Sequence, residues 1–489
     1  MKKILPLLLI FLALEAWAKV DKPNIIFILA DDMSYDSVSA FNDQIGNMKT
    51  PNIDKLVSQG MSFTDAHSGS AVCTPTRYGL LTGRYCWRTK LKREVLWEYG
   101  SPLITADRLT VAKLLKSQGY HTAAIGKWHL GMNWHDKKGK IANYDLKIHD
   151  SFFKGKEAKA RIDRVEKRID FTQRITGGPT DCGFDYFFGV DAPNFPPYVW
   201  QVNDKLLGNP SMAKPKKTFG HPGPMLPGWK LDEIIPTLVE KTEEYIEQRA
   251  KSGKPFFLYL PLTSPHTPIA PGKAFIGKTG ISDYADFVVQ TDDVVGRVMK
   301  ALKKQGLAKN TILIFSSDNG TSGFANFKLL RSKGVNLHNH FSGHKASISE
   351  GGHRVPFVVR WPSGIKAGSR CKQVVSLNDF IATVADLLDY QLPPNAGEDS
   401  TSILPLFKGE KKRLPNRPMV VNHDYGGRFA IRDNQWKLID LGRKPRLYNL
   451  DSDLKEKTNL ASKFPDRVKK MREILNYYKQ SGRSRKRKN

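Results

Sequence analysis

The segment NIIFILADD, residues 24–32, decides the fold of this chain. Its first seven residues are almost all apolar and rich in β-branched side chains, which is typical of a strand buried on both faces of a sheet. Further runs of this kind follow at residues 122–125, 256–260, 311–315 and 355–359. Helix-like stretches occur at residues 108–118, 237–249, 285–305 and 377–388. Strands that alternate with helices predict an α/β domain with a central mixed β-sheet flanked by helices.

Polar side chains stand at the carboxyl ends of four of these predicted strands. In chain order they are Asp31 with Asp32, Lys127 with His129, His266, and Asp318 with Asn319. Open α/β sheets bind their ligands at that edge. One polar residue after a strand is common, but four such ends in succession indicate a shared site.

The oxygen-bearing members of this set predict a metal site. Asp31, Asp32, Asp318 and Asn319 offer the oxygen ligands that a hard divalent cation prefers. Calcium suits the set best, and magnesium is the alternative. The competing interpretation is that the acids cap a loop and a turn. Metal binding is favoured over it because adjacent carboxylates at a strand end repel each other unless a cation lies between them.

The segment CTPTRYGLLTGR, residues 73–84, predicts an anion site beside a thiol. Pro75 suits the first position of a helix and Thr74 suits its N-cap. Cys73 would then lie at the helix N-terminus, where free N–H groups favour an anion. Arg77 follows about one turn later and can fork onto a tetrahedral oxyanion.

Together with Leu81-Thr82-Gly83-Arg84, the C-x-P-x-R pattern at residues 73–77 resembles the signature of the type I sulfatases of the alkaline phosphatase superfamily. Four further segments resemble that family in order along the chain. They are the first strand with its acid pair, GYHTAAIGKWHLG at residues 119–131, the late lysine segment at residues 343–356, and a C-terminal region around residues 431–450. Five ordered segments over most of the chain are hard to produce by chance.

The resemblance implies a formylglycine-dependent mechanism. In that family the motif cysteine, here Cys73, is oxidised to formylglycine by a maturation enzyme that recognises the motif, and one of its oxygens joins the calcium ligands. The hydrated aldehyde attacks sulfur as a gem-diol. The family's residues carry over as Arg77 and Lys127 stabilising the hydrate, His129 holding or deprotonating its second hydroxyl, and His266 with Lys345 binding sulfate and assisting the leaving alcohol.

The chain ends predict export and a second, smaller unit. Residues 1–18 combine two lysines, a short apolar run and an A-x-A ending, as a cleaved secretory signal does. This predicts a periplasmic or secreted protein that is not inserted in a membrane. We expect a catalytic domain over residues 19–395 and an α+β subdomain over 396–480 with a short antiparallel sheet and a terminal helix. A basic tail at 481–489 is predicted to be disordered.

Net charge and cysteine content limit the kinds of partner and of structural feature that the chain can have. The formal net charge of +29 favours anionic partners, and export favours a sulfated glycan over nucleic acid. Four scattered cysteines predict neither a disulfide framework nor a zinc site. The lysine-rich stretch at residues 135–167 is predicted to be a solvated surface insertion. Residues that could line the pocket mouth are Trp87, Arg88, Trp97, Trp134, Asn194, Tyr198 and Trp200.

Two other functions compete with a carbohydrate sulfatase. One is a phosphonate monoester or phosphodiester hydrolase of the same superfamily, some members of which also use formylglycine. The other is a non-catalytic binder of sulfated glycans, which would apply if Cys73 is never converted. The intact C-x-P-x-R pattern and the complete set of acids favour the enzyme.

Overall fold

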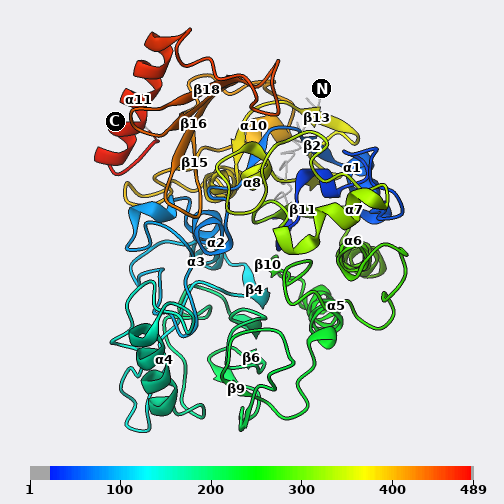
Figure 1. Cartoon of the computed structure of the whole chain (residues 1–489). Coiled ribbons are helices and arrows are strands. Elements are labelled where there is room, and N and C mark those ends of the chain that lie inside the picture. Colours follow the sequence, from blue (N-terminus) through cyan, green and yellow to red (C-terminus); the bar gives the residue numbers. More distant parts are fainter. Residues whose placement is uncertain (1–21, 486–489) are drawn as a thin grey trace, which may run out of the picture.

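The computed structural model describes residues 22–485, so the predicted signal at residues 1–18 and the last four residues of the tail lie outside the described part. Its centre is a ten-stranded mixed sheet (Figure 1). In spatial order the strands are β13 (Ser369–Cys371), β2 (Met61–Phe63), β12 (Phe357–Arg360), β11 (Thr311–Ser317), β1 (Asn24–Ala30), β10 (Phe256–Pro261), β4 (His121–Lys127), β5 (Tyr186–Val190), β6 (Gln201–Val202) and β7 (Lys205–Leu206).

The central five strands, from β11 to β5, run parallel. Strand β1 lies in the middle, with Ile26 opposite Leu258 of β10 and Leu313 of β11. Every residue of β1 is buried, because helices cover both faces of the sheet. The apolar run at residues 24–30 therefore forms the central strand, as its continuous apolar pattern predicts.

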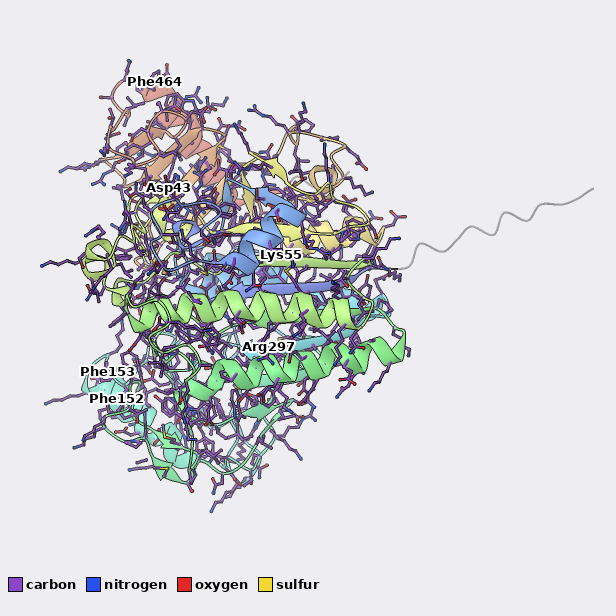
Figure 2. All side chains as sticks on the ribbon, turned by 90° about the vertical axis from the view of Figure 1, so that its right-hand side faces the viewer. Asp43, Lys55, Phe152, Phe153, Arg297 and Phe464 are labelled. Carbon is purple, nitrogen blue, oxygen red and sulfur yellow. The ribbon has the colours of Figure 1, made fainter. Side chains whose placement is uncertain are left out.

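Alternate residues of β1 belong to two different hydrophobic cores. Ile25 and Phe27 belong to the core that contains residues of α2 (Cys73–Thr82), α3 (Val111–Ser117) and α9 (Phe380–Leu387). Ile26 and Ile28 belong to the other core, with residues of α1 (Pro51–Gln59), α5 (Ile234–Ser252) and α6 (Asp283–Lys304). Figure 2 shows the two long helices α5 and α6 lying side by side on their face, where Arg297 pairs with Glu243.

Smaller elements complete the fold. A four-stranded antiparallel sheet near the carboxyl end packs against the terminal helix α11 (Pro465–Gln480) (Figure 1). Its strands are β15 (Val420–His423), β16 (Phe429–Asp433), β17 (Trp436–Asp440) and β18 (Arg446–Asn449). Two-stranded pairs are β3 (Ala66–His67) with β14 (Val375–Ser376) and β8 (Met212–Ala213) with β9 (Pro224–Met225). The remaining helices are α4 (Lys156–Arg168), α7 (Phe327–Ser332), α8 (Glu350–His353) and α10 (Leu404–Phe407).

The architecture confirms the predicted α/β fold with a small antiparallel sheet and a terminal helix. Sequence reasoning missed β2, β13, β6 and β7, which are only two or three residues long, and it also missed β5, an apolar run interrupted by Gly189. Residues 481–485, the first part of the tail predicted to be disordered, instead make contacts: Ser484 is buried and its N–H donates to Asp399 Oδ1 at 2.9 Å.

All four cysteines are free and buried. Among the described residues no helix is long and apolar enough to cross a membrane.

Candidate active site

Four neighbouring strands deliver the predicted site residues to one edge of the sheet. The strands β11, β1, β10 and β4 are adjacent and parallel, so their carboxyl ends meet. The side chains that follow or end them are Asp318 and Asn319, Asp31 and Asp32, His266, and Lys127 and His129. Because β1 lies between β11 and β10, Asp31 and Asp32 stand between the side chains that follow β11 and those that follow β10 and β4.

The carboxylates of Asp31, Asp32 and Asp318 form a buried cluster. One oxygen of each lies within 4.8 Å of the others, and none of the three residues is more than 1% exposed. Burial and the charge of Asp31 hold the pKa of Asp318 well above its ordinary value. Two buried oxygens, Oδ1 of Asp31 and Oδ1 of Asn319, have no hydrogen-bond partner. Acceptor oxygens without donors in so acidic a cluster suit a hard divalent cation.

Cys73 is the first residue of α2 and lies beside this cluster. Its Sγ is within 4.8 Å of a carboxylate oxygen of Asp31 and a ring nitrogen of His266. The helix begins two residues earlier than predicted, with Val72 at the N-cap and Pro75 still inside the first turn. The first turn tolerates proline because its N–H groups have no partner within the helix. Thr74 is therefore not the cap, and its hydroxyl accepts from the Leu96 N–H.

Three cationic side chains contact the acids from different directions. The Arg77 guanidinium donates to Asp318 Oδ2 from Nη2 at 2.8 Å and from Nε at 3.2 Å. Lys127 Nζ donates to Asp31 Oδ2 at 2.7 Å, and Lys345 Nζ lies 2.7 Å from Asp32 Oδ1. Arg77 and Lys127 are fully buried. The guanidinium of Arg77, predicted to fork onto an oxyanion, forks onto the Asp318 carboxylate in this structure.

The two predicted histidines differ in what they contact. His129 Nε2 lies 2.9 Å from the carbonyl oxygen of Leu96. Since a carbonyl oxygen only accepts, Nε2 carries the proton and donates it, and Nδ1 keeps a lone pair without a partner. Burial, aided by the charge of Lys127, lowers the pKa of His129 to about 3. His266 Nε2 lies 3.8 Å from Asp32 Oδ2, and burial lowers its pKa to about 4. Both rings are therefore neutral at pH 7.

Three residues at this site have a left-handed backbone. Asp32 has φ +66°, His129 φ +53° and Ala346, next to Lys345, φ +72°. Such conformations are sparsely populated by non-glycine residues and cluster at functional sites, where surrounding contacts hold them. Here the Asp32 N–H donates to Asp318 Oδ1 at 3.2 Å and the His129 N–H donates to Asp191 Oδ1 at 3.1 Å.

A pocket of about 1040 Å³ opens above the cluster, and Cys73, His129, His266 and Lys345 line it. Of the residues predicted for its mouth, Trp97 and Asn194 are in the lining. The other five lie elsewhere because other contacts hold them. Trp87 packs in the core of the C-terminal sheet and Arg88 pairs with buried Asp399. Trp134, Tyr198 and Trp200 are held by aromatic packing or hydrogen bonds.

Sequence reasoning missed two parts of the pocket wall. The first is the middle of the lysine-rich stretch, where Phe153 and Lys154 reach the pocket although the stretch is predicted to be solvated surface. The second is the segment between β8 and β9, which contributes residues 216–221. The doublet Lys216-Lys217 followed by Phe219 was the available signal, since basic and aromatic residues close together are typical of sites for anionic sugars.

The segment that carries Lys345 is held by close backbone approach. Gly320, just after Asn319, lies so near Gly351 that a Cβ there would meet the Gly351 carbonyl oxygen at 1.8 Å. The Gly320 N–H donates to Gly352 O at 3.0 Å, and the Lys345 N–H donates to Thr321 O at 3.0 Å. The loop after β11 and the lysine segment are therefore one packed unit.

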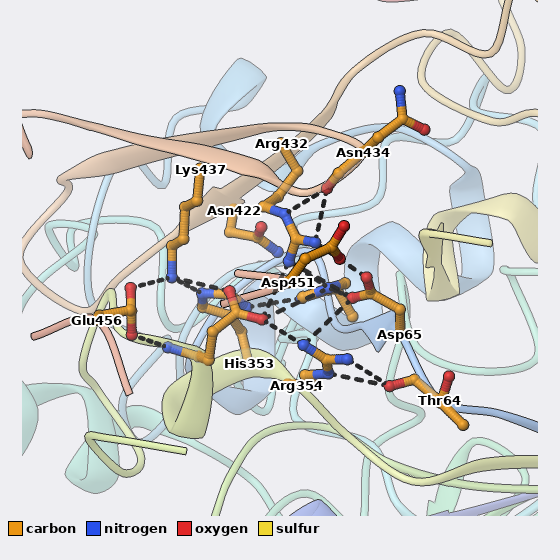
Figure 3. Close-up of polar contacts among 12 residues, drawn as sticks. Thr64, Asp65, His353, Arg354, Asn422, Arg432, Asn434, Lys437, Asp451 and Glu456 are labelled. Carbon is orange, nitrogen blue, oxygen red and sulfur yellow. Dashed lines mark hydrogen bonds and ion pairs between the residues drawn. The ribbon is translucent and has the colours of Figure 1, made fainter. Parts of the chain in front are cut away.

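The far side of the same segment is fixed by buried ion pairs to the C-terminal sheet (Figure 3). Glu350 contacts Arg432 of β16 and Lys437 of β17, each at 3.0 Å, and Arg354 at 3.1 Å. Lys437 also pairs with Glu456 at 2.9 Å. Glu350 thus joins the lysine segment to the C-terminal sheet behind the pocket and is not among the residues that line it.

His67 and His353 extend this network without forming a metal site. Their Nδ1 atoms are 3.0 Å apart, and His67 Nε2 lies 2.7 Å from Asp65. They lie close enough to Glu350 to share an ion. The three cations on Glu350 already satisfy its charge, so the cluster is an ion-pair network.

The fold and this site together define a class: α/β enzymes that place a nucleophile, a cation-binding acid cluster and cationic side chains around one tetrahedral oxyanion. Comparison with known proteins places the chain within that class. The family model described as Sulfatase matches residues 23–390, and the model described as N-sulphoglucosamine sulphohydrolase, C-terminal, matches residues 338–481.

Individual relatives agree. The chain is 32% identical to the N-acetylgalactosamine-6-O-sulfatase of Bacteroides thetaiotaomicron, covering 93% of this chain and 92% of the relative. It is 30% identical to human steryl-sulfatase, covering 84% and 74%. A solved structure from work on glycosaminoglycan metabolism by Bacteroides thetaiotaomicron superposes with a TM-score of 0.80 at 29% identity, covering 94% of this chain and all of that one. The chain belongs to the sulfatase family, which confirms the resemblance read from its motifs, and it is a sulfuric ester hydrolase.

Proposed function

We propose that this enzyme removes O-sulfate from a sulfated carbohydrate, with formylglycine made from Cys73 as nucleophile and one calcium ion held by Asp31, Asp32, Asp318 and Asn319. The observation that carries the proposal is the position of Cys73: its sulfur is next to Asp31 and His266, at the floor of a pocket with lysine and aromatic walls. This chain aligns with 92% of the length of a relative that is named N-acetylgalactosamine-6-O-sulfatase, and that name supports a sugar as substrate.

The acid cluster fits the cation that the family uses. Three buried carboxylates and the partnerless Asn319 Oδ1 form an all-oxygen set, and Asp31 offers a second oxygen without a donor. When bound, calcium would neutralise the acids and polarise the oxygens of the sulfate ester. Magnesium is the weaker candidate because it demands a more rigid octahedral geometry.

The chain's own residues can carry the reaction in balanced steps. One hydroxyl of the hydrated aldehyde at position 73 loses its proton to solvent and attacks sulfur, and the bond from sulfur to the sugar oxygen breaks. Lys345 and His266 bind the sulfate oxygens, and Lys345, whose pKa is raised by the charge of Asp32 in spite of its burial, donates a proton to the leaving alcohol.

His129 is suited to the second step. Its Nε2–H is held by the Leu96 carbonyl, which leaves the Nδ1 lone pair to take the proton of the remaining hydroxyl. The bond from residue 73 to sulfate then breaks, sulfate leaves, and the aldehyde is regenerated. Water rehydrates the aldehyde, Lys345 takes up a proton from solvent and His129 releases the one it accepted. The net reaction therefore adds one water to the ester, gives the alcohol, sulfate and one proton, and returns the enzyme to its first state.

Mass spectrometry of the Cys73 peptide together with sulfate release tests the proposal. Protein made with a formylglycine-generating maturation enzyme is expected to show the aldehyde and to release sulfate from O-sulfated glycosaminoglycan, carrageenan or fucoidan fragments. Protein made without it, and C73A, are expected to release none. Converted protein that hydrolyses a phosphodiester faster than any sulfate ester contradicts the proposal. Unmodified thiol in the native protein, with glycan binding and no turnover, supports the binder instead.

The phosphodiesterase alternative gains no support from the comparisons. A phosphonate monoester hydrolase of Agrobacterium radiobacter superposes with a TM-score of 0.59 at 19% identity, and at that level the likeness shows the fold alone.

We also propose that the chain is exported and processed after Ala18, on the strength of the pattern in residues 1–18. N-terminal sequencing of protein from the periplasm and medium of the host tests this: a mature start at residue 19 is expected, and an intact Met1 in the cytoplasm contradicts it.

A further inference from the structure

The wall of the active-site pocket is strongly basic. Four lysines line it, namely Lys154, Lys216, Lys217 and Lys345, and none of the described lining residues is Asp or Glu. The acids of the cluster lie below the floor and are buried. A wall of one charge sign in a concave site concentrates ligands of the opposite sign. The charge of the pocket wall therefore favours an anionic ligand.

Two of these lysines already have a partner. Lys345 is paired with Asp32, and Lys154 is paired with Glu94 at 3.0 Å and lies over the Trp97 ring. Lys216 and Lys217 are exposed, and neither forms an ion pair with any residue that the structure describes. Their charge is thus available to a ligand in the pocket.

The segment that carries this lysine pair is anchored on both sides. Strands β8 and β9 pair at its base, and the Lys214 N–H donates to Gly223 O at 2.9 Å. On the pocket side His221 is buried, and its Nδ1 lies 3.0 Å from Glu98 Oε2. The Tyr198 hydroxyl donates to His221 O at 2.6 Å. Lys216 and Lys217 therefore stand on a hairpin of defined position.

Aromatic rings complete the wall around the pair. His221 packs against Trp97, Phe153 and Phe195, with ring centroids 4.7 to 5.8 Å apart. Across the mouth, Phe219 of the hairpin meets Phe324 of the loop after β11, with ring centroids 6.2 Å apart. Exposed aromatic rings beside lysines suit a ligand that alternates apolar sugar faces with anionic groups. The volume of about 1040 Å³ is at the top of the range of roughly 300–1,000 Å³ typical of small-molecule sites.

We propose that Lys216 and Lys217 bind a second anionic group of the substrate, a carboxylate or a further sulfate on the sugar next to the one that loses its sulfate. This inference rests on the proposed function and narrows the substrate class to polyanionic glycans. The hairpin holds the lysine pair at the pocket wall, so the pair selects substrates by the charge of the neighbouring sugar and takes no part in bond cleavage.

The test uses three disaccharides that share one O-sulfated hexosamine. In the first the neighbouring sugar is a uronate, in the second its carboxylate is reduced to the alcohol, and in the third the reduced sugar carries a sulfate. For converted wild-type enzyme we expect kcat/KM on each anionic neighbour to exceed that on the neutral one by roughly 3- to 30-fold, the range for two partly exposed ion pairs. The preference should weaken as salt is added. The uronate and the sulfated arm show which anion is bound.

The double variant K216Q/K217Q is expected to lose this preference, with a larger fall in kcat/KM on the two disaccharides with an anionic neighbour than on the neutral one. K216R/K217R is expected to retain it. The matched control is K469Q/K470Q, an exposed lysine pair on α11, which should behave as wild type. Equal losses on all three substrates, or a wild-type enzyme without charge preference, overturn the role of the pair. If converted wild type releases sulfate from none of the three, nor from an aryl sulfate, the proposed function itself fails.

Discussion

Replacing Glu350 by glutamine should destabilise the protein far more than removing a surface charge. Glu350 is fully buried and its carboxylate contacts Arg432, Lys437 and Arg354 at 3.0 to 3.1 Å. The amide keeps the shape but leaves three cations with too little negative charge in a fully buried site. Breaking a buried ion pair by removing one partner costs about 3–5 kcal/mol. Unfolding entropy near 2.1 cal/mol/K per residue converts this to roughly 1 °C of Tm per kcal/mol for a chain of this size.

Urea unfolding of purified E350Q against wild type measures the effect. The matched control is E243Q, which removes the acid of the half-exposed Arg297 pair between α5 and α6 and should cost at most about 1 kcal/mol. A double-mutant cycle with K437M sharpens the test, because Lys437 and Glu350 share one buried contact. The double variant should be more stable than the sum of the single losses by at least roughly 1 kcal/mol. Additivity within about 0.5 kcal/mol would refute the network.

Three further results are expected. The neighbouring cations hold the pKa of Glu350 well below its ordinary value, although burial opposes this, so the ionised carboxylate stabilises the fold fully above about pH 4.5 and this contribution is lost as the pH falls. Below that pH the wild type should therefore lose stability more steeply than E350Q, by up to roughly 1.4 kcal/mol per pH unit. Urea unfolding at a series of acid pH values measures the difference. Dialysis against a chelator should lower Tm and abolish sulfate release, and calcium at about 100 times its Kd should restore roughly 2.7 kcal/mol; an unchanged Tm contradicts a cation in the acid cluster. W97A should raise KM for a sulfated glycan by roughly 3- to 10-fold with little change in kcat, because the ring lines the pocket away from the acids, whereas a fall in kcat alone contradicts a stacking role.

The contrast between the two lysine segments shows where pattern reasoning succeeds. Lys345 follows a motif and contacts Asp32, whereas Lys216 and Lys217 follow none and line the same pocket. A motif records chemistry that is shared with other chains. The hairpin's place over the pocket depends on the pairing of β8 with β9 and on the buried contact of His221 with Glu98, which no local pattern encodes.

Local pattern was sufficient for the four strands that carry the site and for the residues at their ends. A continuous apolar run can be buried on both faces only in the middle of a covered sheet, so residues 24–30 had to be central and Asp31 with Asp32 had to lie at its ligand-binding edge. Tertiary structure alone decided which charges meet. Arg77 lies 241 residues from the Asp318 it contacts, and Glu350 meets Arg432 and Lys437 only because the small antiparallel sheet packs behind the lysine segment. Such contacts depend on how separate elements pack, and the spacing of residues along one chain carries no record of that packing.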